Sequence, residues 1–278
     1  METWKGGEYE PNASALAVYP AFSQNPNNSA LRFFCVEIPL DLGASAMSVH
    51  FLRQIDKLKR LILTLGEMVQ DAVDHSIISV VNRDVDIAEG VLRAEEEIDE
   101  MEVDIEEECL HTLALHQPVA FDLRYVVSVL KINNDLERVS DLAKNIAQQA
   151  MFLARESKLI ETPFDLSHMA RLVKTMLRDA LKAMVNVDTI LAQQVIDGDD
   201  AVDSMHESVY DIMFVKLREM PQFAPQLLHL MSVSRQLERI ADHAVNIAED
   251  VLYTSGGEIV RHRKNKAKEK EQAQSTTR

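Results

Sequence analysis

The feature that most constrains the fold of this chain is a helical segment that occurs twice. Residues 135–147 read DLERVSDLAKNIA and residues 236–248 read QLERIADHAVNIA, so eight residues return at identical spacing. The period of the apolar residues predicts a helix for both copies. Each helix then carries a Glu, an Asp and an Asn at i, i+4 and i+8, spread over about 80° of one face at ~100° per residue.

In each copy the Glu and the Asp stand one helical turn apart and repel each other. The pairs are Glu137/Asp141 in the first copy and Glu238/Asp242 in the second. Such a like-charge pair destabilises a helix by about 0.2–0.5 kcal/mol. Because the repeat places this unfavourable pair at the same position twice, we expect a cation between the carboxylates.

The repeat also includes the preceding segments of the chain. Aligning the NRD triplet at residue 82 with the NVD triplet at residue 186 gives each half a second acidic pair, which is Glu95/Asp99 in the first half and Asp199/Asp203 in the second. The repeat of roughly 100 residues exceeds the 20–50-residue period of solenoid units. We therefore expect two related helical bundles.

Composition and charge narrow the class of protein. Leu, Ile, Val, Ala and Met dominate while Gly, Pro and aromatic residues are sparse, which favours long helices over sheets. The net charge of −16 would repel nucleic acid but suits cations or basic protein surfaces. Cys35 and Cys109 form no ligand or redox spacing, and no membrane span or secretory signal is recognisable. We expect a cytoplasmic protein.

Apolar period and turn residues divide the chain into four parts. Residues 1–46 show no helical period and are either a disordered extension or a stretch upstream of a start at Met47. Residues 47–160 and 161–255 are each predicted to form one three-helix bundle, and residues 256–278 a basic tail that is solvated or weakly contacts a membrane surface or partner. The expected helices span about 50–81, 85–116, 120–156, 166–185, 188–220 and 225–253. The predicted fold is all-α, with two tandem, pseudo-symmetric antiparallel three-helix bundles.

The turns of these hairpins place the acidic pairs at the same height. In the first half the two pairs are equidistant from Pro118, and in the second half they are equidistant from a point beside Pro221. Four carboxylates can therefore converge in each half, as a candidate metal site made of Glu95, Asp99, Glu137 and Asp141, and another made of Asp199, Asp203, Glu238 and Asp242. Ligands that are all oxygen suit iron, Mn²⁺ or Mg²⁺ better than a structural zinc.

A solvated acidic face is the alternative to a metal site. The apolar stripe on 120–156 points roughly away from Glu137 and Asp141, and the charges could be balanced by Arg124, Arg138, Arg235 or Arg239. Glu108 and His111 match the Glu-x-x-His spacing of di-iron bundles, but there is no second copy, so His111 is interpreted as structural. His243 points some 100° away from Asp242. With no phosphate loop and no nucleophile arrangement, we expect no catalytic residues.

The residues that form these patterns resemble the PhoU family of phosphate-regulon accessory proteins. The resemblance covers about residues 47–263, since the acidic motif occurs twice in the right order. The matching stretches are QPVAFDLR at 117–124, DLERVSD at 135–141 with NIA at 145–147, LERIADHA at 237–244 with NIAE at 246–249, and GEIVRHR at 257–263. Ser140 and Ala241 stand where the family often has Gly.

The resemblance implies a metal-binding regulator rather than an enzyme. Proteins of this family hold metal clusters on the bundle surface through paired acidic motifs, which correspond here to the eight carboxylates named above. They couple a phosphate-specific ABC transporter to a sensor histidine kinase and repress the phosphate-starvation response when phosphate is plentiful. We also expect a homodimer that reaches the membrane only through its partners. A carboxylate-bridged metal-dependent enzyme and a metal-free helical adaptor are the alternatives.

Overall fold

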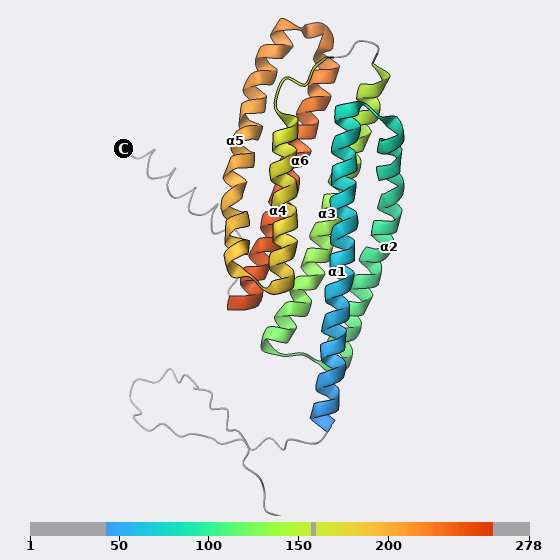
Figure 1. Ribbon diagram of the computed structural model, residues 1–278, viewed down its shortest axis with the longest axis vertical. Coiled ribbons are helices and arrows are strands. Elements are labelled where there is room, and N and C mark those ends of the chain that lie inside the picture. Colours follow the sequence, from blue (N-terminus) through green and yellow to red (C-terminus); the bar gives the residue numbers. More distant parts are fainter. Residues whose placement is uncertain (1–42, 157–159, 258–278) are drawn as a thin grey trace, which may run out of the picture. The chain divides into compact units, whose positions relative to one another are not determined.

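The computed structural model describes residues 43–156 and 160–257, and these residues fold as one helical unit (Figure 1). The helices are α1 (Gly43–Asn82), α2 (Val85–His116), α3 (Ala120–Arg155), α4 (Leu166–Asn186), α5 (Thr189–Glu219), the short 3-10 helix η1 (Pro221–Phe223) and α6 (Ala224–Gly256). No strand occurs among the described residues. The predicted all-α class is confirmed.

One boundary differs clearly from the sequence-based expectation. Helix α1 begins at Gly43, seven residues before the predicted start at His50. The segment Gly43–Ser48 is rich in Ala and Ser, which are compatible with a helix but produce no apolar period. Most of the predicted N-terminal extension (1–42) and nearly all of the basic tail (258–278) lie outside the described residues, so the predicted domain bounds stay predictions.

Aspartates cap the N-termini of three of the described helices. The side chain of Asp84 accepts a hydrogen bond from the backbone N–H of Ile87, and Asp165 accepts one from His168. Asp188 accepts two, from Ile190 and Leu191, at 3.0 Å each. Each N-cap contributes about 0.5–2 kcal/mol because it satisfies a donor that has no partner within its helix.

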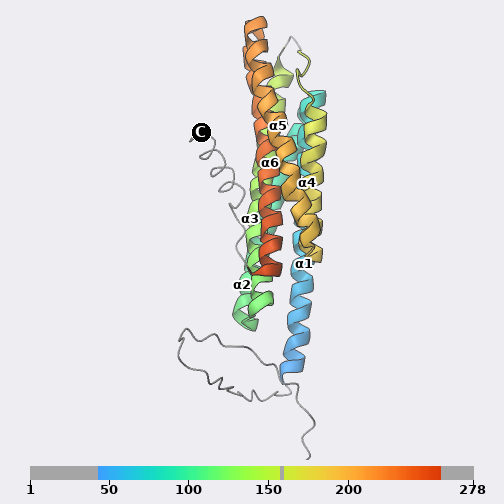
Figure 2. The same cartoon turned by 90° about the vertical axis from the view of Figure 1, so that its left-hand side faces the viewer.

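The helices pack as two sets of three that share one core. Helices α1, α2 and α3 contact one another, as do α4, α5 and α6. Figures 1 and 2 show all six running along a common direction. The largest fully buried side chains come from both sets and include Leu58, Ile98, Leu136, Leu177 and Met213. Burying each such side chain stabilises the fold by roughly 1.5–3 kcal/mol.

The two halves meet along two pairs of equivalent helices, α3 against α6 and α1 against α4. The seam between α3 and α6 contains buried polar contacts as well as apolar ones. His243 Nδ1 lies 2.8 Å from Asp135 Oδ1, and Lys131 Nζ lies 3.0 Å from the buried carboxylate of Asp250. Such directional contacts favour one register of the two halves, because any shift would leave buried charge without its partner.

Candidate metal centres

The first acidic cluster lies where α2 and α3 run side by side. Helix α2 supplies Glu95 and Asp99, and α3 supplies Glu137 and Asp141. Each helix also buries apolar residues in the core, so its acidic residues are directed toward the edge of the bundle. Glu95 is the most covered member of the cluster, with 14% of its side chain exposed, while 42% of the Asp141 side chain is exposed.

The carboxylates of the first cluster affect one another's pKa values. Partial burial raises the pKa of Asp99, and the negative charges of Glu95 and Asp141 raise it further. Partial burial also raises the pKa of Glu137, where the Arg138 guanidinium opposes the shift and Asp141 and Asp99 add to it. The four residues that the hairpin symmetry predicted to converge therefore lie within electrostatic range of one another, and their role as metal ligands stays a prediction.

Two cations of the protein reach into the first cluster. The ammonium group of Lys144 forms a hydrogen-bonded ion pair with Glu95. The guanidinium of Arg138 lies 3.3 Å from Glu137 and 3.6 Å from Asp141. Arg138 was expected as a balancing charge from the sequence, whereas the contact of Lys144 was not.

Glu102 adds a fifth carboxylate that the sequence analysis did not include. It lies one turn beyond Asp99 on α2, and partial burial together with the charges of Glu106 and Asp99 raises its pKa. Asn133 on α3 donates a hydrogen bond of 2.8 Å to the backbone oxygen of Glu102 and one of 3.3 Å to its Oε1. The i, i+4, i+7 spacing of Glu95, Asp99 and Glu102 was the available signal.

The second acidic cluster occupies the equivalent place on α5 and α6. Partial burial raises the pKa of Glu238, and the charges of Asp242, Asp203 and Asp199 raise it further, against the opposing effect of Arg235. Partial burial and Asp203 also raise the pKa of Asp242, while His243 and Arg239 oppose the shift. All four predicted residues of the second half are thus neighbours as well.

His206 is the residue of the second half that the sequence analysis missed. By the repeat alignment it stands at the position of Glu102, one turn beyond Asp203 on α5. Its Nδ1 lies 2.8 Å from the hydroxyl of Ser234, which stands at the position of Asn133. Burial and the nearby Arg235 lower the pKa of His206, so its imidazole is neutral at neutral pH.

Both clusters fit a cation in charge and in donor type. Carboxylate oxygens are the donors that hard cations prefer, and partial burial with mutual repulsion raises the pKa values of Asp99, Glu137, Glu238 and Asp242. Glu137 Oε2 is buried and accepts no hydrogen bond from the part of the chain that the structure describes, although Arg138 Nε lies 3.3 Å from it. As the side chains stand, no three His, Cys, Asp or Glu residues in the described part of the chain are arranged to hold a metal ion.

The remaining candidates from the sequence have other roles. Arg124 donates from Nε to the backbone oxygen of Thr254 and so joins α3 to the end of α6, away from the acidic clusters. Glu108 accepts a 2.8 Å hydrogen bond from Gln54 of α1, and His111 is exposed. The charge of His243 opposes the raised pKa of Asp242 in the second cluster. Its ring nitrogen Nδ1, however, forms a hydrogen bond with Asp135 of α3.

This fold and these clusters define a class: a tandem pair of three-helix bundles with one cluster of paired carboxylates in each half. A family model described as the PhoU domain matches this chain twice, over residues 62–150 and 166–251. A relative from Aquifex aeolicus, named phosphate-specific transport system accessory protein PhoU homolog, is 38% identical over 217 residues, covering 78% of this chain and 97% of the relative. The chain belongs to the PhoU family.

Solved structures agree with this assignment. The crystal structure of PhoU from Pseudomonas aeruginosa matches with a TM-score of 0.72 and 32% identity, over 75% of this chain and 100% of that chain. The phosphate transport system regulatory protein PhoU from Streptococcus pneumoniae matches with a TM-score of 0.68 and 28% identity, over 76% and 99%. The resemblance found in the sequence is therefore confirmed over both halves.

Proposed function

We propose that this protein is a regulatory accessory of phosphate uptake that couples a phosphate-specific ABC transporter to a sensor histidine kinase. In this role it represses the phosphate-starvation response when phosphate is plentiful. The observation that carries the proposal is the double match to the PhoU domain, one match per half. The names of the relatives, which describe accessory proteins of phosphate-specific transport, support it.

The protein acts in this proposal by binding partners, not by catalysis. Its long helices present extended side faces of the kind that helical domains of a kinase or the inner face of a transporter can contact. The net charge of −16 favours basic partner surfaces and association that weakens with added salt. None of the described helices is both long and apolar enough to cross a membrane. We place the protein in the cytoplasm as a homodimer that meets the membrane through its partners.

The acidic clusters are proposed to hold metal ions, one site or group of sites in each half. The ligands in the first half are Glu95, Asp99, Glu137 and Asp141, and those in the second are Asp199, Asp203, Glu238 and Asp242. Their oxygen donors suit iron, Mn²⁺ or Mg²⁺. A bound cation would supply positive charge that relieves the repulsion between carboxylates and fixes the spacing of neighbouring helices.

Deletion of the gene tests the regulatory role. We expect phosphate-scavenging genes to be expressed in phosphate-rich medium in the deletion strain and to be silent again when the full chain is restored. Affinity purification with the transporter and the kinase as baits then tests the partners directly. Unchanged expression in the deletion strain, or hydrolysis of a phosphoester by the pure protein at enzyme-like rates, would contradict the proposal.

A further inference from the structure

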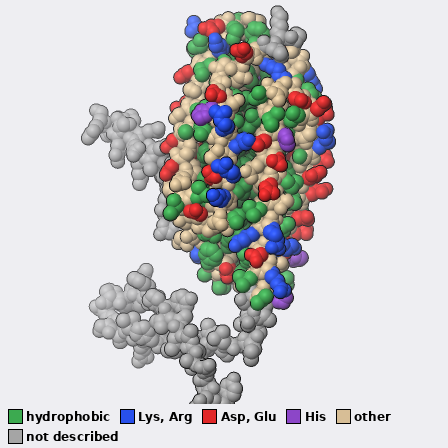
Figure 3. All heavy atoms as spheres, in the orientation of Figure 1, with side chains coloured by type: hydrophobic (Ala, Val, Ile, Leu, Met, Phe, Trp, Pro, Cys, Tyr) green, Lys and Arg blue, Asp and Glu red, His purple; other side chains and the backbone are tan. Residues whose placement is uncertain are grey.

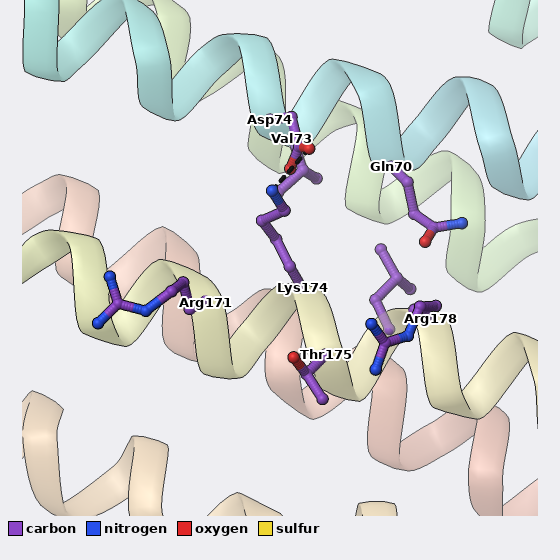
Figure 4. A pocket seen from close by; sticks show the side chains of 8 residues that line it. Gln70, Val73, Asp74, Arg171, Lys174, Thr175 and Arg178 are labelled. Atoms are coloured by element: carbon purple, nitrogen blue, oxygen red, sulfur yellow. Dashed lines mark ion pairs between the residues drawn. The ribbon is translucent and has the colours of Figure 1, made fainter.

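A concave, basic surface lies between α1 and α4, where the two halves meet. Figure 4 shows Lys174 extending from α4 toward Asp74 on α1, with Arg171 and Arg178 on either side of it along α4. The cavity has a volume of about 280 Å³, close to the lower end of the range for small-molecule sites, about 300–1,000 Å³. Its lining is completed by Gln70, Val73, Thr175 and Leu177. A second cavity of about 260 Å³ shares Asp74, Arg171 and Lys174 with it.

The basic character of this surface contrasts with the chain as a whole. Helix α4 carries four basic residues and one acidic residue, although the protein has a net charge of −16. Three of those basic residues line the cavity, against the single carboxylate of Asp74. By the repeat alignment Lys174 and Arg178 stand at the positions of Gln70 and Asp74 on α1, so the positive charge belongs to the second half alone. Figure 3 shows basic side chains gathered over this face.

The cations of the cavity are only partly used by the protein. Lys174 Nζ lies 2.6 Å from Asp74 Oδ2, and Arg178 Nε lies 3.0 Å from Asp179 Oδ1. Within residues 43–156 and 160–257, Arg171 has no carboxylate at ion-pair distance; its Nη2 lies 3.4 Å from a ring nitrogen of His168. Guanidinium groups offer several donors in a fixed plane that matches phosphate oxygens. Gln70 and Thr175 can donate further hydrogen bonds to an anion.

Asp74 gives the cavity a way to distinguish between anions. Its Oδ1 accepts no hydrogen bond from the described residues, so the carboxylate keeps acceptor capacity beside three cations. Rotation about the last side-chain bond, which has broad preferences in Asp, exchanges the two oxygens. A carboxylate repels a fully ionised anion such as sulfate but accepts a hydrogen bond from an anion that retains a proton, as phosphate does at neutral pH.

We propose that the cavity between α1 and α4 binds the phosphate group of a small anion, either inorganic phosphate or a small phosphate monoester. Arg171, Lys174 and Arg178 hold the ionised oxygens, and Asp74 accepts the hydrogen of the protonated one. Because α1 and α4 belong to different halves, an anion bound there contacts both. The site is separate from the acidic clusters, and its binding chemistry does not depend on the regulatory role.

Calorimetric titration of the full chain with inorganic phosphate and, separately, with sulfate tests the site. We expect saturable phosphate binding that the double variant Arg171→Gln/Arg178→Gln weakens at least tenfold, because two charge-assisted contacts are lost together. Lys182→Gln is the matched control: it removes a charge from α4 outside the cavity and should change the affinity by less than about twofold. The unfolding temperature of each variant checks that the bundle is intact.

The selectivity of the site is tested through Asp74. The wild-type chain should prefer phosphate over sulfate by roughly tenfold, and Asp74→Asn should abolish most of that preference. Competition with glycerol phosphate distinguishes the two sources, since an ester that displaces phosphate at lower concentration is the better ligand of the same cavity. Absence of saturable binding at millimolar phosphate, or equal losses in Lys182→Gln and the double variant, would overturn the site. Binding of polyglutamate in place of phosphate would also overturn it. Repression of phosphate-scavenging genes would then remain as a separate question.

Discussion

The acidic clusters of the two halves occupy equivalent positions, yet their surroundings differ in charge. In the first cluster Lys144 forms an ion pair with Glu95, whereas Val245 stands at the equivalent position beside the second cluster. The two also differ one turn further along, where the first has Glu102 and the second has His206. The first cluster thus contains an ammonium group and more carboxylate, and the second contains an imidazole.

The repeat keeps the paired carboxylates in both halves and varies the residues beside them. The spacing of the paired carboxylates on each helix is the same, so both halves concentrate negative charge at one height of a hairpin. The neighbouring positions decide how much of that charge the protein neutralises itself. The first cluster relieves its repulsion partly through Lys144 and Arg138. In the second cluster the charge of Arg235 opposes the raised pKa of Glu238, and the charges of His243 and Arg239 oppose that of Asp242.

Removing the carboxylates should give the largest effect. We expect Glu137→Gln/Asp141→Asn to remove the metal of the first half and Glu238→Gln/Asp242→Asn that of the second, so each double variant loses about half of the bound metal and the quadruple variant nearly all of it. Elemental analysis of the purified proteins measures this. Full metal retention in the quadruple variant would show that the clusters are solvated acidic faces.

Exchanging the residues at positions 144 and 245 should give the next largest effect. Lys144→Val removes a competing ammonium and should strengthen Mn²⁺ binding in the first half, while Val245→Lys should weaken it in the second. We expect about tenfold in each direction, because a partly exposed charge beside the site contributes roughly 1–2 kcal/mol. Titrations in chains whose other cluster is neutralised isolate each site. Lys182→Val removes a lysine from α4, away from both clusters, and is the control. If it changes the Mn²⁺ affinity as much as Lys144→Val does, the effect of Lys144 is not local.

A smaller effect is expected from exchanging the residues at positions 102 and 206. Glu102→His adds a nitrogen donor to the first cluster and should shift its preference toward Fe²⁺ over Mg²⁺, and His206→Glu should shift the second cluster the other way. We expect the ratio of the Fe²⁺ affinity to the Mg²⁺ affinity to change a few-fold in each variant. Competitive dialysis measures this ratio. If both ratios stay unchanged, these two side chains do not touch the ion.

The smallest effect is expected for the free energy of unfolding of the metal-free protein as the pH changes. Burial and mutual repulsion raise the pKa values of Glu137 and Glu238 above the usual 4.5, so the folded state binds protons more tightly than the unfolded state. The free energy of unfolding should therefore rise as the pH falls from neutral through the raised pKa values toward 4.5. We expect on the order of 1 kcal/mol or less per group, because these side chains stay partly in water.

Denaturation with urea in the presence of a chelator measures this dependence. Glu238→Gln should remove more of the pH-dependent gain than Glu137→Gln, because Arg138 already opposes the shift of Glu137 at close range. An equal or larger effect of Glu137→Gln would contradict the weaker neutralisation expected for Glu238.

Sequence reasoning identified the helices closely because their ends are set by local chemistry. The predicted second helix matches α2 at both ends, Val85 and His116, where an aspartate caps the start and a proline follows the end. The start of α1 was missed because its first turns carry no apolar period. The convergence of the acidic pairs could also be deduced, since a hairpin with a short turn fixes which residues lie at the same height. Whether metal binds there stays a prediction.

The sequence by itself determined the two halves, their helices and the position of paired carboxylates on each helix, because period, caps and turns act over a few residues. Only the tertiary structure decided which cation reaches which carboxylate, as with Lys144 and Glu95, and that α1 and α4 enclose a basic cavity. Those outcomes depend on how helices far apart in the chain pack against each other. The free energy of that packing comes from many buried contacts at once, so no short pattern in the sequence encodes it.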